Sequence, residues 1–434
     1  MLRAKSEWNL AYNEEADDNL HDIKSLAAND MKRILSRKSQ LRMIAFVMTL
    51  TAVVGYAQEP QQLNPAYEKL VQSLGDQSFQ VRERAHAKLA EIGLSARREL
   101  AAGLRSPDLE IRSRVRRIYV DLMYEDFEQN LQRFIDDVDG KLEHDLPGWD
   151  LYQKIIGSNP EERKFFAAMV RAEAKLLRAI ETGKGLAEQL QERVKQLQPY
   201  GNYTPTGPTI PQIESIATVM LGASELTQAE REALISPVYN LLNYSQIKSQ
   251  IIDKPKDDVG KRMTREWAEV ASKSRNKTLG LMLILNYGFE ETGLKVARDL
   301  LGNTETYSTS EQYAAICAAR FGGASEVELL LPLLTQTTLV HSWSTPQAGG
   351  KLIKTQLRDT ALIMLLHLTK QNPEDYGYRF SRPSPIYIYE VYSCGFTEDE
   401  NRDKAHTKWN TWWNDNGQKW IQENAKSEHP DKSK

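Results

Sequence analysis

Few residues of this chain have the type and spacing that catalysis requires. Ser245 and Lys248 match the Ser-x-x-Lys spacing of a nucleophile and its base, but the companion motifs of such enzymes are missing. The segment Gly349–Leu352 lacks both the earlier Gly and the Ser or Thr of a phosphate-binding loop. The seven histidines are scattered, and no His-Glu-x-x-His or Cys-x-x-Cys spacing occurs. We therefore expect no catalytic residue, no metal and no cofactor, although motifs do not test a site assembled from distant residues.

An acidic cluster at residues 136–140 has the composition of a calcium-binding loop. If Gly140 is the sixth residue of an EF-hand loop, Ile135 is the first and Leu146 the twelfth. Both positions need oxygen ligands, which Ile and Leu do not supply. The sequence therefore favours a solvated helix end.

Aromatic residues near the C-terminus form the candidate interaction surface. They are spaced three, four, seven or eight residues apart in a final helix and preceded by tyrosines: Trp409, Trp412, Trp413, Trp420, Tyr387, Tyr389 and Tyr392. Such residues can stack on sugar rings. Aromatics at helical spacing more often form the core seam of a helix, here one that would cap a helical array. The sequence favours the core seam and leaves binding open.

Arginines are concentrated between residues 82 and 117, which gives this segment a local basic excess. One interpretation is a surface for an anionic polymer. The favoured interpretation is that these arginines bridge to acids of neighbouring helices, such as Glu83 or Asp108. The whole chain carries a formal net charge of −3, so we expect no nucleic-acid partner.

The N-terminal region predicts export. Residues 31–57 carry five Lys or Arg and no acid, then an apolar run from Met43 to Val54, and end in Gly55-Tyr56-Ala57. These are the three parts of a secretory signal peptide, cleaved after Ala57. The acidic residues 1–30 are interpreted as a start-site artefact or a disordered leader, with Met31 as the true start. The alternative is an uncleaved signal-anchor helix, which the short apolar run disfavours.

The elements that must position all these residues are helices with an internal repeat. The segments Gln80–Ala85, Glu110–Val115 and Gln356–Ala361 share one pattern, with apolar residues continuing on one helical face. Shorter helices precede the first two copies, and neither helix of a pair can bury its apolar stripe alone. We expect a stacked helical array in which Val81, Ala85, Leu89, Ile111, Val115, Leu357, Ala361 and Leu365 are buried.

This pattern resembles the HEAT-repeat superfamily, whose second helix carries apolar-Arg-acid-x-Ala. The resemblance covers residues 66–124 and 355–370, with a weaker version at 279–335. The segments Leu146–Trp149, Leu357–Leu362 and His367–Gly377 also resemble a group of uncharacterised exported bacterial HEAT-repeat proteins. The resemblance implies an all-α fold, an α-solenoid of HEAT-like helical hairpins with a long-helix insert and a loop-rich C-terminal region. It implies no particular activity.

The expected organisation follows the chain in order. It comprises a HEAT-like repeat pair (60–124), a helical segment (125–198), a linker (199–212), helical repeats (213–336), a Ser/Thr/Gly-rich loop (337–354), a third HEAT-like helix with a loop and a terminal Trp-rich helix (355–424), and a charged tail (425–434). Cys317 and Cys394 are expected to remain unpaired. The alternative is a disulfide that ties the helix of Cys317 to the segment before the last helix.

The expected function follows from architecture alone. Repeat arrays present long binding surfaces, so we expect an exported, non-enzymatic scaffold that contacts another protein or envelope macromolecule in the periplasm or outside the cell. No membrane span is expected after signal cleavage. The rival hypotheses are a hydrolase acting on an extracellular polymer, or a carbohydrate-binding protein, with a site in the 337–396 region. A purely structural envelope component is a third.

The export hypothesis predicts the N-terminus of the mature protein. Mass-spectrometric identification of the N-terminal peptide of protein recovered from the native host should show that it begins Gln58-Glu59-Pro60, because the small-x-small segment ends at Ala57. Peptides from residues 1–30 recovered from the same cells would contradict the assignment of Met31 as the start.

Overall fold

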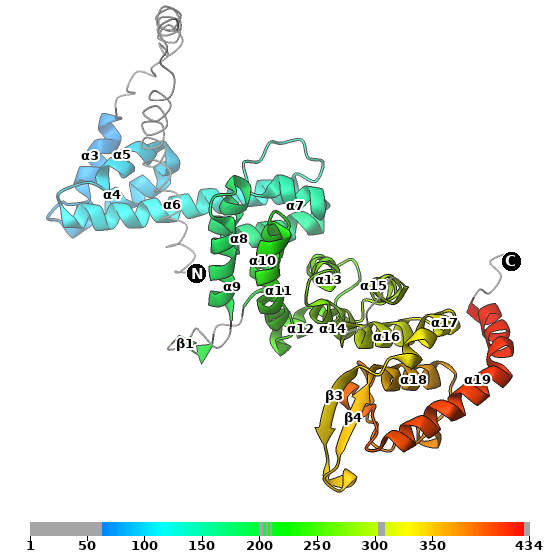
Figure 1. The fold of residues 1–434 in the computed structure, drawn as a ribbon. Coiled ribbons are helices and arrows are strands. Elements are labelled where there is room, and N and C mark those ends of the chain that lie inside the picture. Colours follow the sequence, from blue (N-terminus) through cyan, green and yellow to red (C-terminus); the bar gives the residue numbers. More distant parts are fainter. Residues whose placement is uncertain (1–62, 199–202, 205–206, 209–210, 303–308, 429–434) are drawn as a thin grey trace, which may run out of the picture. The chain divides into compact units, whose positions relative to one another are not determined.

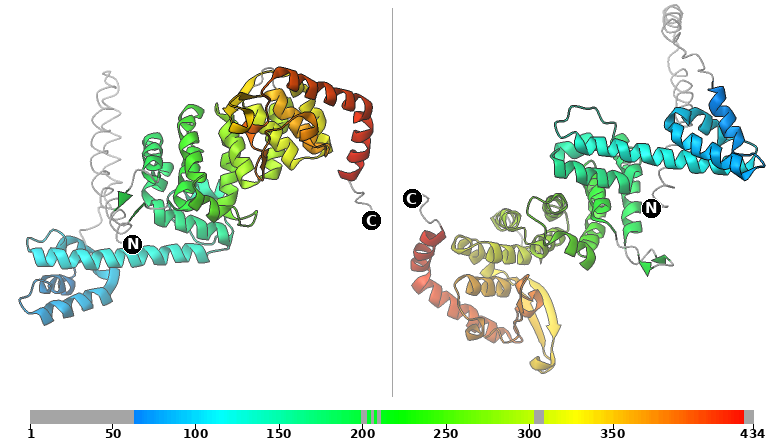
Figure 2. Two further views of the ribbon diagram at one scale, coloured as in Figure 1. Left: turned by 90° about the horizontal axis from the view of Figure 1, so that it is seen from below. Right: turned by 180° about the vertical axis from the view of Figure 1, so that it is seen from behind.

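The structure is a computed structural model that describes residues 63–198, 203–204, 207–208, 211–302 and 309–428 (Figures 1 and 2). The predicted signal peptide with its cleavage site at Ala57, the leader 1–30 and most of the predicted linker 199–212 lie outside this part. Within 203–208, two two-residue strands, β1 (Tyr203–Thr204) and β2 (Gly207–Pro208), pair antiparallel. The described residues are mostly helical and divide into two compact units.

The first unit extends to Leu146 and includes Ser158–Lys175. Its N-terminal part is two helical hairpins that pack together: α3 (Pro65–Ser73) with α4 (Phe79–Ile92), and α5 (Arg97–Gly103) with α6 (Leu109–Asp136), with the short 3-10 helix η1 (Gly93–Ala96) between them. Asn64 caps α3, and Asp108 caps α6 by accepting from the backbone N–H groups of Glu110 and Ile111. One apolar core lies between the hairpins.

The predicted repeat register is confirmed at seven of its eight positions. Ala85, Leu89, Ile111 and Val115 are buried in the first unit, and Leu357, Ala361 and Leu365 are buried in the second. Val81, in the first turn of α4, is only half-buried. The spacing of the apolar residues therefore identified which face of each helix is buried, but not at which residue the burial begins.

Two arginines of this segment, Arg82 and Arg114, form ion pairs between α4 and α6, as the sequence favoured. Arg114 on α6 donates to Glu83 on α4 at 2.7 Å and to Glu110 at 2.6 Å. The hydrogen bond from Arg114 holds the pKa of Glu83 below its usual value. Asp108 was named as a partner for these arginines, and it caps α6 instead.

The boundary expected between residues 124 and 125 is wrong. It falls inside α6, a single helix of 28 residues that ends at Asp136. The sequence contains no Gly or Pro between Leu109 and Asp139, so nothing interrupts the hydrogen-bond ladder. The expected segment 125–198 is also divided between the two units, since Pro147–Gly157 and the residues from Leu176 onward belong to the second.

The second unit contains two rows of packed helices. One row runs α9–α11–α14–α16–α18, and beside it lies a second row, α10–α13–α15–α17. Gly280 allows α14 to approach α13 closely, because a Cβ there would lie 2.2 Å from the Ser272 backbone nitrogen. The bounds are α7 (Trp149–Ile155), α8 (Pro160–Thr182, shared between the units), α9 (Leu186–Leu197), α10 (Ile213–Ala223), α11 (Gln228–Leu242), α12 (Ser245–Ile251), α13 (Val259–Ser272), α14 (Lys277–Tyr287), α15 (Glu290–Gly302), α16 (Thr309–Phe321), α17 (Val327–Leu330) between 3-10 helices η2 (Ala324–Glu326) and η3 (Leu331–Thr335), and α18 (Leu357–Leu368).

The segment 337–354, expected as a loop, is instead an antiparallel β-hairpin. Strands β3 (Leu339–Ser344) and β4 (Leu352–Gln356) pair, joined by a turn that contains a short 3-10 helix, η4 (Pro346–Ala348), and two glycines with positive φ (Figure 1). The Ser, Thr and Gly content suggested a loop, but these residues alternate with Val340, Trp343 and Ile353. Ile353 and Thr355 are buried on one face of β4, which is the period-2 pattern of a half-buried strand.

The rest of the chain is loop-rich until the last helix. It contains the 3-10 helices η5 (Pro373–Tyr376) and η6 (Val391–Ser393) and the paired two-residue strands β5 (Pro383–Ser384) and β6 (Ile388–Tyr389). Helix α19 (Asp399–Glu428) then extends beyond Asn424, where the charged tail was expected to begin. Lys and Glu are good helix formers, which is why the helix continues into that segment.

Replacing Leu89 with Ala should lower the free energy of unfolding of the first unit by about 2–5 kcal/mol, because it leaves a cavity between the hairpins. Leu109→Ala is the matched control, since Leu109 is 74% exposed. We expect the control to change stability by less than about 0.5 kcal/mol. Denaturant unfolding measures both, and equal effects would contradict the packing described here.

Cys317 on α16 and Cys394 after η6 are both fully buried, and both are unpaired, as expected. Burial raises the pKa of both thiols. Thiol counting on denatured, unreduced protein should therefore give two free thiols per chain. In native protein both should react slowly, since the thiolate is the reactive form. Finding no free thiols in monomeric chains would show that the two cysteines pair.

Candidate functional site

Helix α19 is held in place by a buried ion pair. The Arg402 side chain is 1% exposed and that of Asp359 on α18 is fully buried. The Arg402 Nε lies 2.9 Å from one carboxylate oxygen of Asp359 and 3.0 Å from the other. Isolated buried charges are costly, and good geometry with further hydrogen bonds is what makes such a pair tolerable.

Further hydrogen bonds connect this pair to three other segments. Arg402 also donates to the Lys354 carbonyl on β4 at 2.8 Å and to Asp399. The Asp359 carboxylate accepts a hydrogen bond from the backbone N–H of Gln356, the residue before α18. The Asp359 backbone carbonyl accepts one from the buried Tyr378 hydroxyl at 2.7 Å. The start of α18, the end of β4, the segment after η5 and the first turn of α19 therefore share one network.

A second buried network fixes the β-hairpin to the helices. Gln312 on α16 donates to Thr360 on α18 at 2.9 Å and to the Val391 carbonyl at 3.2 Å. Its amide oxygen lies 2.8 Å from His341 Nε2 on β3, so His341 donates there. Burial lowers the pKa of His341, which favours the neutral ring in this position.

The structure places Trp409 in the core and leaves its neighbours partly exposed. Trp409 is fully buried, and its ring centroid lies 5.4 Å from that of Trp412 and 5.5 Å from that of Trp413. Trp412, Trp413 and Trp420 are each half-buried. Trp409 therefore lies in the core seam, and the other three present only part of their rings to solvent.

The tyrosines pack elsewhere. The Tyr387 ring lies edge-on to Tyr313 of α16 with centroids 6.1 Å apart, and burial raises the pKa of Tyr387 to about 12. Tyr389 lines a shallow cavity with Arg320 and His367. The ring contacts described for Tyr387 and for the tryptophans thus do not form one continuous aromatic surface. His367 lines the same cavity as Tyr389.

The acidic cluster at 136–140 closes the end of α6. The Asp137 carboxylate accepts from the backbone N–H groups of Lys141 and Leu142 and lies 3.0 Å from His144 Nε2. Asp137 is therefore buried in local hydrogen bonds rather than solvated, while Asp136 and Asp139 are exposed. Among the residues that the structure describes, no three His, Cys, Asp or Glu side chains lie together as metal ligands do.

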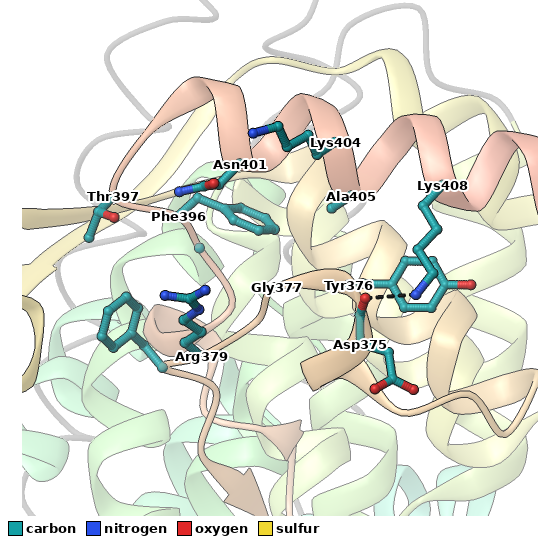
Figure 3. Close-up of a pocket in the computed structure, with 12 residues that line it drawn as sticks. Asp375, Tyr376, Gly377, Arg379, Phe396, Thr397, Asn401, Lys404, Ala405 and Lys408 are labelled. Carbon is teal, nitrogen blue, oxygen red and sulfur yellow. Dashed lines mark hydrogen bonds between the residues drawn. The ribbon is translucent and has the colours of Figure 1, made fainter.

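A pocket of about 240 Å³ opens between α19 and the segments that follow α18 (Figure 3). Its walls come from the end of η5, residues 377–380, residues 395–397 and the first turns of α19. Tyr376 and Phe396 are 5% and 3% exposed, so they form an apolar floor. These elements are the ones that the Asp359–Arg402 network holds together.

The polar groups of this pocket fall into two sets. Lys408 donates to the Asp375 carbonyl at 2.8 Å and lies 4.6 Å from the centre of the Tyr376 ring, and Lys404 pairs with Glu400. Opposite Lys408 lie Arg379, Asn401 and Thr397, whose side chains have no described partner within residues 63–428 (Figure 3). Chemically, these groups can hold an anion through charge and donated hydrogen bonds.

Sequence reasoning did not find this pocket. The rival hypotheses did place a site in the 337–396 region, which contains Arg379, Tyr376 and Phe396, but they named neither these residues nor the pocket residues of α19. The spacing of Lys404 and Lys408 at i and i+4 marks one face of α19, which is the available signal. Nothing in the sequence relates that face to Arg379.

No family model, curated protein or solved structure matches this chain. Across the described residues, no helix combines the length and apolar character needed to cross a membrane.

The buried pair predicts a large mutational effect. Asp359→Ala should lower the free energy of unfolding of the second unit by about 3–5 kcal/mol, because it leaves Arg402 buried without its carboxylate. Asp403→Ala is the control between the same helices, since Asp403 is exposed and lies 3.7 Å from Arg358. Exposed pairs contribute about 0–1 kcal/mol. Denaturant unfolding measures the free energy of unfolding of both variants. If Asp359→Ala loses no more stability than Asp403→Ala, the buried pair does not hold α19 in place.

Proposed function

We propose that this chain is an exported binding protein, an α-solenoid of HEAT-like hairpins that acts as an interaction scaffold in the cell envelope. Export is supported by the basic, apolar and small-residue segments of residues 31–57. The solenoid is supported by the two rows of helices in the second unit, where each helix packs on its row neighbours as well as on its hairpin partner.

The observation that carries binding, rather than chemistry, is the composition of the pocket beside α19. Its available polar groups are a guanidinium, an amide and a hydroxyl, which bind an anion but are poor general bases near neutral pH. The one carboxylate in its lining, Asp375, points away from Arg379 (Figure 3). The partner is therefore proposed to be another protein or envelope macromolecule that presents an anionic group.

Site-directed photo-crosslinking in the native host tests this function. A photoreactive residue is placed at one exposed position at a time along the second unit: Asn240, Glu328 or Asn401. The scaffold hypothesis predicts a discrete covalent adduct with the same partner in the exported protein. The control is the same variant with residues 31–57 deleted, which should remain inside the cell and lose the adduct.

Two results would contradict the proposal. One is exported protein that gives no adduct at any of these positions although the photoreactive residue is incorporated. The other is purified mature protein that cleaves an extracellular polymer, which would make the chain an enzyme.

A further inference from the structure

The β3–β4 hairpin has one strand edge that no segment among the described residues covers. Strand β3 pairs with β4 alone, whereas β4 also pairs on its other side, where Lys354 meets Phe396. The Lys354 N–H donates to the Phe396 carbonyl at 2.9 Å, and the Phe396 N–H donates to the Lys354 carbonyl at 3.1 Å. In Figure 1, β3 accordingly lies on the outer side of the hairpin. The small sheet therefore ends at β3.

The hydrogen bonds of Lys354 fix the direction of every backbone group in this hairpin. In an antiparallel pair, the N–H and C=O groups of successive residues point alternately to one side of the strand and to the other. Because Lys354 points away from β3, its neighbours Ile353 and Thr355 point toward it. Their partners in the register are Trp343 and His341, which therefore point back toward β4.

The remaining residues of this stretch, Ser342 and Ser344, must then point their N–H and C=O groups outward. Both residues are exposed. Among the residues that the structure describes, no hydrogen bond to these outward groups is found. Donors and acceptors that repeat every second residue along a strand match the backbone of another extended polypeptide, which can pair with them as a further strand.

The charges around the hairpin indicate what kind of segment pairs with it. Residues 339–356 contain two lysines and no Asp or Glu. Lys354 is exposed on one face, and the exposed Arg382 lies on the other, with its guanidinium 4.8 Å from the centre of the Trp343 ring. The second lysine pairs with Glu398, whereas no ion pair is described for Lys354 or Arg382 in residues 63–428. A strand beside β3 would thus have a cation within reach of its side chains on either face.

We propose that the open edge of β3 binds an extended acidic segment of a partner polypeptide, which pairs with the outward backbone groups of Ser342 and Ser344. A second copy of β3 fits less well, because it would bring two sets of the same cations together. The inference rests on the proposed binding function and names the class of partner. It places this contact at the hairpin and not in the pocket beside α19.

Titration of the full mature chain with short peptides tests the proposal. The probe is the acetylated and amidated peptide Thr-Glu-Val-Thr-Val-Glu-Thr, followed by calorimetry at low salt. One comparison is the same peptide N-methylated at two adjacent central residues, whose N–H groups point to opposite edges of a strand. It should bind at least about fivefold more weakly, because a donor is lost whichever edge pairs. The other comparison has Lys in place of both Glu and should also bind at least about fivefold more weakly.

The variant Ser342→Pro tests the same edge from the side of the protein. Because the Ser342 N–H points away from β4, proline removes a donor to the added strand but no hydrogen bond within the hairpin. We expect the variant to fold and to bind the acidic peptide at least about fivefold more weakly. Ser342→Ala keeps the N–H and should bind like the native chain. Circular dichroism and thermal unfolding show whether both variants are folded.

Two further measurements locate the bound peptide. Saturating acidic peptide should slow amide hydrogen exchange in residues 339–344 and leave exchange in residues 79–92 of the first unit unchanged. Arg382→Ala should weaken binding of the acidic peptide about two- to fivefold, which is the range of an exposed ion pair. Arg84→Ala removes an exposed arginine of the first unit and should change nothing.

Equal binding of the acidic and the N-methylated peptide, or unchanged hydrogen exchange in residues 339–344, would overturn the assignment. So would unchanged affinity of folded Ser342→Pro, or no binding of the acidic peptide at millimolar concentration. If Ser342→Pro does not fold, the N-methylated peptide decides the same point. If the assignment fails but the photo-crosslinks persist, the scaffold function stands. If the photo-crosslinks are also missing, the binding function itself fails.

Discussion

The C-terminal part of this protein depends on one buried charge pair. Asp359 begins α18 through its bond to the Gln356 N–H, and the same carboxylate receives Arg402 of α19. Separating two buried charges costs several kcal/mol, so α19 has one favourable position along α18. Since Arg402 also donates to Lys354 and Tyr378 donates to the Asp359 carbonyl, β4 and the segment after η5 are fixed with it. The walls of the candidate pocket follow from that constraint.

The helices of the second unit are stabilised by their neighbours rather than by themselves. Helices of 11–15 residues, such as α10, α13 and α14, are marginal in isolation. Helix α14 is apolar all round and buried between α11, α13, α15 and α16, whereas α13 has one apolar face. Stacking in two rows leaves an extended surface of helix faces and loops. This arrangement is the physical basis for proposing a scaffold.

Helix α19 has one buried face and, beside it, residues that line the candidate pocket. Residues at spacings of three and four, Arg402, Ala405, His406 and Trp409, form its buried face. Lys404 and Lys408 lie one position aside and line the pocket, so the register that buries the first set also places the second. Trp412, Trp413 and Trp420 are packed less fully than Trp409 and are therefore partly exposed. Their exposure does not require an aromatic surface that binds sugars.

Several of the local elements could be predicted from the amino-acid sequence. The period of the apolar residues located α4, α6 and α18 and seven of the eight predicted core positions, because a helix buries the residues on one of its faces. It missed the β3–β4 hairpin, since two short half-buried strands leave a weak period-2 signal among Ser, Thr and Gly. It also divided α6 at a residue where nothing breaks the helix. The pairing of Asp359 with Arg402, and the position of Arg379 in the same pocket as Lys404 and Lys408, could not be predicted in this way. The members of each pair are 25 to 43 positions apart, and such contacts depend on packing between elements, which no local pattern encodes.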